Sequence, residues 1–468
     1  MASELVSMVS ALDVSDAVPL DAAVAPSQPI DISKIISADV LILIFEAVVQ
    51  PTMQLPWPWE RYDQERARAP YVLAAVCKSW RRLAIDTSSL WTYFGFEVNK
   101  APQHVFDTRL ARSKDAPIDI FFDAGSASRD AGTNMFVVIR RLHELSQRWR
   151  FVNIHYPSYS EPYDLTPLTR PTPHLRSLIL ESLIFKTDDD DDEFEPDPVL
   201  FPYAPLFQQM SLDDIARRWS MSSSGVAALS ELNIWLYNWT PDTLRSFLEP
   251  VATNLRVLSL IGQVGSTDFG HPGSVTVLPK LVDLTAQQAE WLVHIRAPAL
   301  QRLQLWGSHN DQEGSLGTVS SLQPFADTVQ SLVLWGRVSA RDLDALNVLS
   351  NVTSVHFAVH PAAANLYGAH NDSCYIYSET LAHLAEAKPQ IWPSLTRMSF
   401  GNEVWPEAEQ LEVHLDELEK LVKLRQKTGS GDRTKVEETD FKHGLQLHAS
   451  STLQIWVRDA VDRLNTLY

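Results

Sequence analysis

A short pattern of apolar residues recurs along the chain and constrains its fold more than any other feature. The pattern is φ-x-x-φ-x-φ, where φ is apolar and x is any residue, and its second half alternates as a half-buried β-strand does. Because successive strand side chains point to opposite faces, we expect the φ residues to enter a core and the intervening residues to line an open face. The units begin at Trp149, Leu175, Leu229, Leu255, Leu281, Leu300, Val329, Val352 and Leu395.

The spacing of these units indicates a repeat protein. Leu229, Leu255 and Leu281 lie 26 residues apart, which fits the roughly 20 to 29 residues of a leucine-rich repeat. Between two units, Thr240 and Pro241 form a typical helix start before an apolar helical stripe. The units resemble degenerate leucine-rich repeats in which the Asn or Cys that closes each turn is mostly missing. The resemblance implies an α/β solenoid, a horseshoe of alternating strands and helices.

Changes in composition along the chain suggest where its domains begin and end. The solenoid is assigned to residues 96–405, with an acidic and solvated loop at 187–198. Residues 406–468 contain amphipathic stretches and are predicted to form C-terminal helices around a flexible linker at 428–440. Residues 1–34 are predicted to be a disordered tail. The first thirty contain no Lys or Arg, so they lack the basic region of a secretory signal and the arginines of a mitochondrial presequence.

Residues 35–95 carry the pattern of short amphipathic helices instead. A first helix is expected after Ser37, a suitable N-cap. A polar and aromatic insert, residues 50–70, follows it. The apolar residues at helical spacing in this first helix are Val40, Leu41, Ile44, Phe45 and Val48.

A second apolar stripe continues through "VCKSWRRLAIDTSSLW", residues 76–91. Within this stripe Cys77 is interpreted as a small hydrophobic residue, because it has no second Cys or His at metal-ligand spacing. The basic residues lie off the stripe and are expected to be solvated. They are Lys78, Arg81 and Arg82.

The same two segments resemble a known family. "IISADVLILIF", residues 35–45, and "VCKSWRRLAIDTSSLWTYF", residues 76–94, are similar to the F-box of fungal F-box proteins. That pattern is a leading Leu-Pro, a helix of the form E-I-L-x-x-I-F, and then V-C-K-x-W-R-x-L-A with a Thr-x-x-Leu-Trp ending. The second half matches closely, whereas Ile36-Ser37 replaces the Leu-Pro dipeptide and Asp39 replaces the usual Glu.

The resemblance implies that the chain is the substrate-recognition adaptor of an SCF-type cullin-RING ubiquitin ligase and acts in ubiquitin-dependent degradation. The F-box would dock on the Skp adaptor subunit, and the repeats would bind a protein substrate. A helical segment of this size cannot hide all its large apolar side chains, so an exposed apolar face is expected on physical grounds as well. The residues predicted to contact Skp are Ile36, Val40, Leu41, Ile44, Val76 and Trp80.

Two alternatives stay open at this level. Trp80 and Phe45 fit the core of the helical segment as well as they fit a partner surface. The whole chain also fits a ligase-independent interaction scaffold with the same fold, because the first half of the F-box pattern departs from the consensus.

Substrate contacts are expected on the open face of the repeats. The residue after the last φ is tryptophan in three units, at Trp235, Trp306 and Trp335, and tryptophan is enriched among binding hot spots. Arg302 and His356 are predicted to add specificity, together with Glu231 and Asp283 in neighbouring positions. The alternative is that each tryptophan packs under the loop that follows its strand.

The composition of the chain and its lack of catalytic motifs argue against nucleic-acid-binding proteins, membrane proteins and enzymes. With 39 basic against 58 acidic residues the net charge is −19, which disfavours nucleic acid and anionic membranes as partners. No apolar run is long enough to span a bilayer. Two cysteines give no disulfide framework, so residence in the cytoplasm, the nucleus or both is expected. No phosphate-binding, zinc-protease or nucleophile-elbow motif occurs, so we predict a non-enzyme without a cofactor.

Overall fold

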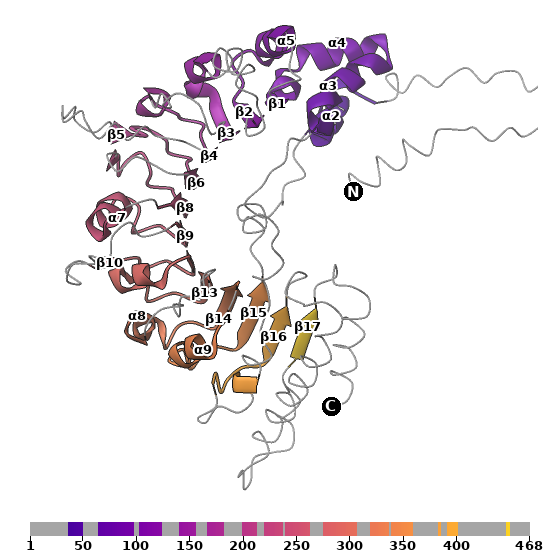
Figure 1. The fold of residues 1–468 in the computed structure, drawn as a ribbon. Coiled ribbons are helices and arrows are strands. Elements are labelled where there is room, and N and C mark those ends of the chain that lie inside the picture. Colours follow the sequence, from indigo (N-terminus) through magenta and orange to yellow (C-terminus); the bar gives the residue numbers. More distant parts are fainter. Residues whose placement is uncertain are drawn as a thin grey trace, which may run out of the picture. The chain divides into compact units, whose positions relative to one another are not determined.

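The chain divides into two compact units, Met1–Ile184 and Phe185–Tyr468. Each unit contains helices and parallel strands (Figure 1), which agrees with the expected mixture of α and β structure. The computed structural model describes residues 36–49, 64–97, 103–123, 140–155, 166–181, 199–212, 220–236, 239–262, 275–306, 319–336, 338–358, 382–384, 391–400 and 446–449.

The first unit begins with short helices packed on one another. They are α2 (Ala38–Val49), α3 (Gln64–Val76), α4 (Lys78–Asp86) and the 3-10 turn η2 (Ser88–Trp91). Ser37 caps α2 as predicted, because its Oγ accepts a hydrogen bond from the Val40 amide at 3.4 Å. The helices share a core, whose buried members are Leu41, Phe45, Val49, Leu73, Ala84, Leu90 and Trp91.

Two features of this segment differ from the sequence interpretation. Helix α3 begins at Gln64, so the last residues of the expected insert 50–70 are helical and include Pro70. The second stripe is also not one helix. Cys77 adopts an extended conformation (φ −157°, ψ 172°) and separates α3 from α4, where its Sγ accepts from the Trp80 amide at 3.5 Å. Cys77 is therefore a helix cap and not a core residue.

The helices continue into four parallel strands of the same unit. These strands pair in chain order, and residues such as Ile120, Val152 and Leu178 place their side chains in the core between the sheet and its helices. The strands and their connecting helix are β1 (Tyr93–Glu97), α5 (Gln103–Ser113), β2 (Ile118–Asp123), β3 (Trp149–His155) and β4 (Ser177–Glu181).

Buried arginines join the helices to these strands. The Asp119 carboxylate on β2 is paired with Arg66 from α3 and with Arg150 from β3. Arg66 also donates from Nε to the Val49 carbonyl at 2.9 Å, which satisfies the end of α2. Arg109 on α5 donates to the carbonyl oxygens of Tyr93 and Ala67. The helical segment and β1 to β3 are thus one packed body within the first unit.

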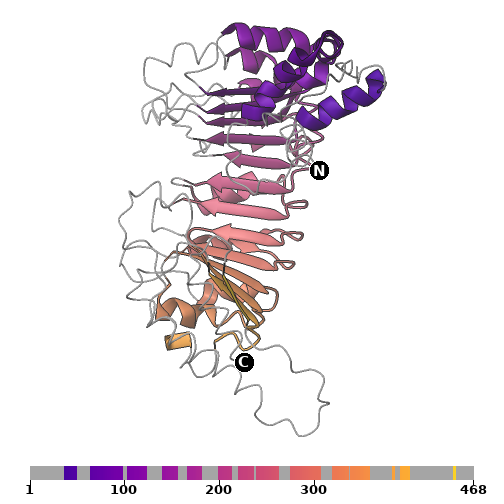
Figure 2. The ribbon, with the colours of Figure 1, turned by 90° about the vertical axis from the view of Figure 1, so that its right-hand side faces the viewer.

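In the described part of the second unit, nine strands lie side by side in parallel in one sheet (Figure 2). Helices α7 (Pro241–Leu248), α8 (Val319–Leu322) and α9 (Ala340–Leu346) lie along one side of these strands (Figure 1). The strands are β6 (Gln209–Leu212), β8 (Glu231–Trp235), β9 (Val257–Ile261), β11 (Asp283–Ala286), β13 (Arg302–Trp306), β14 (Ser331–Trp335), β15 (Ser354–Ala358), β16 (Arg397–Phe400) and β17 (Gln446–Ala449). The same part contains two further short pairs, β5 (Val199–Leu200) with β7 (Ser220–Met221) and β10 (Thr276–Val277) with β12 (Ile295–Arg296).

The apolar pattern predicts these strands well. All nine predicted units contain a strand, and the first φ residue of each, from Trp149 to Leu395, is buried. The helix expected after Thr240 is α7, where the Thr243 amide donates to Thr240 Oγ1 at 3.2 Å. Strands β1, β2, β6 and β17 were not predicted. Within 406–468 the described residues, Gln446–Ala449, form β17, which lies between the predicted linker and the last predicted helical stretch. The predicted C-terminal helices, like the tail 1–34, the loop 187–198 and the linker 428–440, lie outside the described residues.

Candidate docking surfaces

Helix α2 is apolar on two sides, and only one of these sides is buried in the core of the helical segment. Leu41, Phe45 and Val49 recur every four residues and enter the core with at most 4% exposure. A second stripe, one residue earlier in each turn, points outward. Its members are Val40, Ile44 and Val48, with exposed fractions of 46%, 38% and 49%, next to Leu43 at 64%.

Helix α3 repeats this arrangement. Ala67, Pro70 and Leu73 are buried, whereas Val72 and Val76 are 61% and 58% exposed. Tyr71 is partly exposed and its ring makes an edge contact with Trp91 at 5.1 Å between centroids. Helices α2 and α3 pack against each other. We call the exposed residues of the two helices the apolar surface; they are Val40, Leu43, Ile44, Val48, Tyr71, Val72 and Val76.

The structure separates the residues predicted to contact Skp. Val40, Ile44 and Val76 belong to the apolar surface. Leu41 does not, because its side chain lies in the helical core and is 4% exposed; its assignment as a contact residue is corrected on this ground. Ile36 and Trp80 are partly buried against that core.

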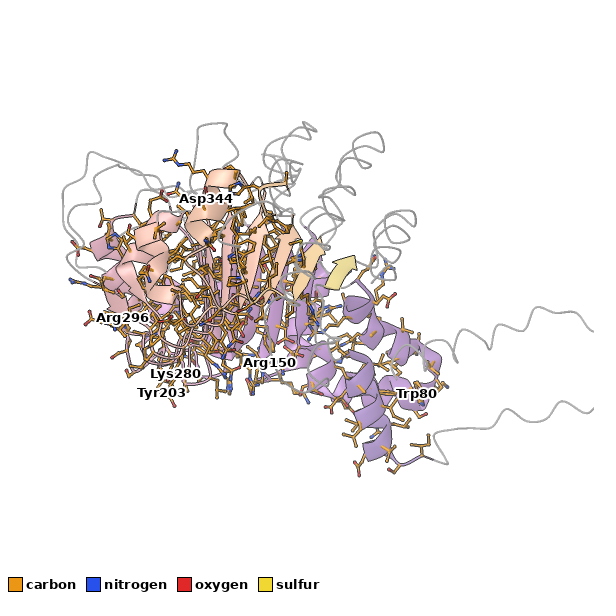
Figure 3. The ribbon with its side chains drawn as sticks, turned by 90° about the horizontal axis from the view of Figure 1, so that it is seen from below. Trp80, Arg150, Tyr203, Lys280, Arg296 and Asp344 are labelled. Atoms are coloured by element: carbon orange, nitrogen blue, oxygen red, sulfur yellow. The ribbon has the colours of Figure 1, made fainter. Side chains whose placement is uncertain are left out.

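Trp80 lies between the two expected roles. Its ring is 4.8 Å from the ring of Phe45, which is completely buried, so Trp80 closes the edge of the core while part of it faces outward. Figure 3 shows Trp80 among the helices of the first unit. Phe45 is a core residue.

The basic residues of α4 are exposed, as predicted. Arg81 donates from Nε to the Ala74 carbonyl at 2.9 Å and ties α4 to α3. Arg82 and Asp86 approach to 4.0 Å, but both side chains are at least 70% exposed, so this ion pair contributes little to stability.

In the second unit, three columns of side chains occupy the sheet face opposite the core. The register places residues from neighbouring strands side by side. The first column is Gln209, Glu231, Val257, Asp283, Arg302, Ser331, Ser354 and Arg397. The second is Ser211, Asn233, Ser259, Thr285, Gln304, Val333, His356 and Ser399. The third runs from Trp235 and Ile261 to Trp306, Trp335 and Ala358.

The third column does not place the three tryptophans on adjacent strands. Trp306 and Trp335 are direct neighbours on β13 and β14. Trp235 is separated from them, because its neighbour on β9 is Ile261 and strand β11 follows. Trp306 is only 7% exposed, and the other two tryptophans are half-buried. Trp306 therefore fits the packed alternative, and Trp335 is the better placed of this pair for a partner.

The second column holds a set of side-chain hydrogen bonds. Asn233 donates from Nδ2 to Ser211 Oγ at 3.1 Å, and His356 Nδ1 lies 2.8 Å from Ser399 Oγ. Burial lowers the pKa of His356, the positive charge of Arg302 lowers it further, and a hydrogen bond with the backbone of Ser399 opposes both. The neutral form of His356 is thereby favoured in the folded protein.

The first column is the most open and carries the charges. Glu231, Arg302 and Arg397 are exposed. Asp283 is less exposed, and it accepts a hydrogen bond from Gln304 Nε2 at 2.9 Å while its other oxygen lies 3.7 Å from Arg302 Nε. The charged residues predicted to give specificity, Arg302, Glu231 and Asp283, thus share one column with Arg397. Arg397 was not predicted, although it follows the φ residue Leu395 in the same pattern.

A hollow of about 580 Å³ lies at the turns that precede β8, β9 and β11. Lys280 Nζ donates to Asn254 Oδ1 at 2.8 Å, and Asn254 Nδ2 donates to the Ala227 carbonyl at 2.7 Å. These bonds tie three successive turns together, so the polar groups of the hollow serve the fold.

Neither a cluster of metal ligands nor a membrane-spanning helix is found among the described residues. No group of three or more His, Cys, Asp or Glu side chains is arranged to hold a metal ion there. None of the helices in that part of the chain has both the length and the hydrophobicity required to cross a bilayer.

Neither a protein-family model nor a curated protein sequence matches the chain.

Proposed function

We propose that the chain is the substrate-recognition adaptor of an SCF-type cullin-RING ubiquitin ligase. In this proposal the apolar surface of α2 and α3 docks on the Skp adaptor subunit, and the open face of the second unit binds a protein substrate. The chain performs no chemistry itself, needs no cofactor and acts by positioning. Ubiquitin transfer belongs to the partner subunits.

One observation carries the proposal. The core of the helical segment is filled by Leu41, Phe45 and their neighbours, and yet the same helices hold seven further large apolar side chains that are 37% to 64% exposed. Several large exposed apolar side chains on one small helical segment are costly in water and favour a partner surface there. Val40, Leu43, Ile44 and Val76 of this surface lie in the two segments that resemble an F-box, which gives the partner a candidate identity.

Ile36 and Ser37 stand where the F-box pattern has a Leu-Pro dipeptide, and this difference bears on the proposed docking to Skp. Ser37 caps α2 and Ile36 packs against the core, so the substituted dipeptide still starts the helix. The start of α2, and with it the position of Val40 on the apolar surface, does not require the consensus proline.

The test is copurification of the full chain with the Skp adaptor. The variant Val40→Asp, Val76→Asp places two charges on the apolar surface and is expected to abolish capture. A matched control is Val275→Asp, Val199→Asp, which charges two valines of similar exposure, 45% and 51%, in the second unit. Circular dichroism establishes that both double variants are folded.

Capture by the unmodified chain and by the control, together with loss in the first variant, supports the adaptor. If the unmodified chain captures no Skp, the adaptor proposal is wrong and the ligase-independent scaffold becomes the better explanation. Equal capture by both double variants would place the Skp contact elsewhere on the chain.

A further inference from the structure

The charges of the first column are separated by sign along the sheet. Glu231 on β8 and Asp283 on β11 are acidic, whereas Arg302 on β13 and Arg397 on β16 are basic. Between the two arginines lie only the hydroxyl side chains of Ser331 and Ser354. The first column is therefore an ordered electrostatic pattern on a chain that is acidic as a whole.

We propose that the arginine half of the first column binds an acidic, extended segment of the substrate that runs across the strands. This inference rests on the proposed function and names the substrate class for its binding face. Arginine is suited to the role, because its planar guanidinium forms charge-assisted and often bidentate hydrogen bonds with carboxylates.

Both arginines are available for such contacts. The Arg302 side chain is 50% exposed, and its approach to Asp283 at 3.7 Å is too long for a hydrogen bond. Arg397 is exposed, and no carboxylate in the described part of the chain forms an ion pair with it. The serines between them add hydroxyl donors without adding bulk or negative charge.

The register gives the spacing of the acidic residues. Arg302 and Arg397 are three strands apart, which corresponds to roughly 14 Å at the usual separation of about 4.8 Å between strands. An extended segment advances about 3.4 Å per residue, so this distance matches about four residues. Side chains four residues apart in an extended segment point to the same side, so both carboxylates can face the sheet.

The acidic half of the column sets the polarity. Glu231 is also three strands from Arg302, on the other side. In such a segment one acidic residue lies opposite Arg302 and the other opposite Arg397. A basic residue about four positions from the first of these, in the direction away from Arg397, would lie opposite Glu231. The favoured segment thus carries a basic residue followed by two acidic residues at intervals of about four, read in either chain direction.

The test uses a fluorescent peptide with Lys at one position and Glu about four and eight positions later in a Gly/Ser background. A second peptide has the same composition with the three charged residues adjacent. Fluorescence anisotropy with the full chain at low salt measures both affinities. We expect the spaced peptide to bind more tightly.

Two double variants of equal net charge separate a site from a general charge effect. Arg302→Glu, Arg397→Glu reverses the arginine half, whereas Arg245→Glu, Arg296→Glu changes exposed arginines on α7 and on β12 (Ile295–Arg296; Arg296 is labelled in Figure 3). The first is expected to weaken binding of the spaced peptide about tenfold or more, and the second to leave it nearly unchanged.

Equal weakening by the two variants, equal binding of the two peptides, or no binding of either peptide would overturn the proposal. Skp capture of the same variants keeps this outcome distinct from failure of the proposed function. The arginines lie outside the apolar surface, so capture should persist whether or not the peptide binds.

Discussion

The carboxylate of Asp119 on β2 and the guanidinium of Arg150 on β3 form a bidentate pair. Arg150 Nε lies 2.7 Å from Oδ1 and Nη2 lies 2.8 Å from Oδ2, while the Asp119 side chain is only 3% exposed. This contact raises the pKa of Arg150, mainly through the hydrogen bond with Asp119. Arg66 reaches the same carboxylate from α3, so one buried aspartate connects the helical segment to two strands.

Asp119→Asn is expected to destabilise the first unit strongly. It removes the negative charge that two arginines share, and breaking a buried pair by loss of one partner costs about 3 to 5 kcal/mol. Urea denaturation of the full chain measures the change. The matched control is Asp107→Asn, which breaks an ion pair with Arg141 whose side chains are 47% and 34% exposed, and there the loss should stay below about 1 kcal/mol. Equal effects of the two substitutions would mean that Asp119 does not hold the unit together.

Phe45→Ala and Val40→Ala should differ in stability although both residues belong to the apolar pattern of α2. Phe45 is completely buried against Trp80, so its truncation leaves a cavity and costs about 3 to 5 kcal/mol. Val40 is 46% exposed, and its truncation should change the free energy of unfolding by less than about 1 kcal/mol. Thermal unfolding of both variants checks this division between core and apolar surface. A large loss in Val40→Ala would remove Val40 from that surface.

The sequence predicts the strands because their information is local. Each φ-x-x-φ-x-φ unit contains the alternation that one strand needs, and every predicted unit forms a strand. Strand β6 was missed although Phe207, Met210 and Leu212 fit the same pattern, because the long gap between Leu175 and Leu229 was interpreted as holding an insertion.

The docking surfaces are less predictable, because they depend on packing between elements. On α2 the buried Leu41 and the exposed Val40 are adjacent and equally apolar, and only the position of α3 and η2 decides which one enters the core. The interruption of the tryptophan column, in contrast, can be derived from the sequence. The units that begin at Leu255 and Leu281 place two strands between β8 and β13, and neither unit has a tryptophan after its last φ residue.

Gly262→Ala is expected to destabilise the second unit for two reasons. Gly262 has φ +114°, a conformation that residues with a Cβ rarely adopt, and an added Cβ would lie 2.2 Å from the Leu236 carbonyl oxygen. Strain and displacement of the backbone together should cost roughly 2 kcal/mol or more. Urea denaturation measures the loss, with Ser224→Ala at an exposed turn as the control, where the change should stay within about 0.5 kcal/mol. A neutral Gly262→Ala would show that the turn after β9 relaxes freely.

His294 should make the second unit less stable in acid. Its side chain is 4% exposed in η6 (Ala289–His294), burial lowers its pKa from 6.5, and the negative charge of Asp242 opposes this only in part. At a pH just below 6.5 this histidine therefore binds a proton in the unfolded chain but not in the folded chain. Its contribution to the free energy of unfolding is constant above the unfolded pKa and decreases as the pH falls below about 6.5. His294→Gln should reduce the slope of the urea midpoint against pH in this range, because the titrating group is gone. His356→Gln reports separately on the other histidine with a lowered pKa, so retention of the full slope in both variants would assign the acid sensitivity to other groups.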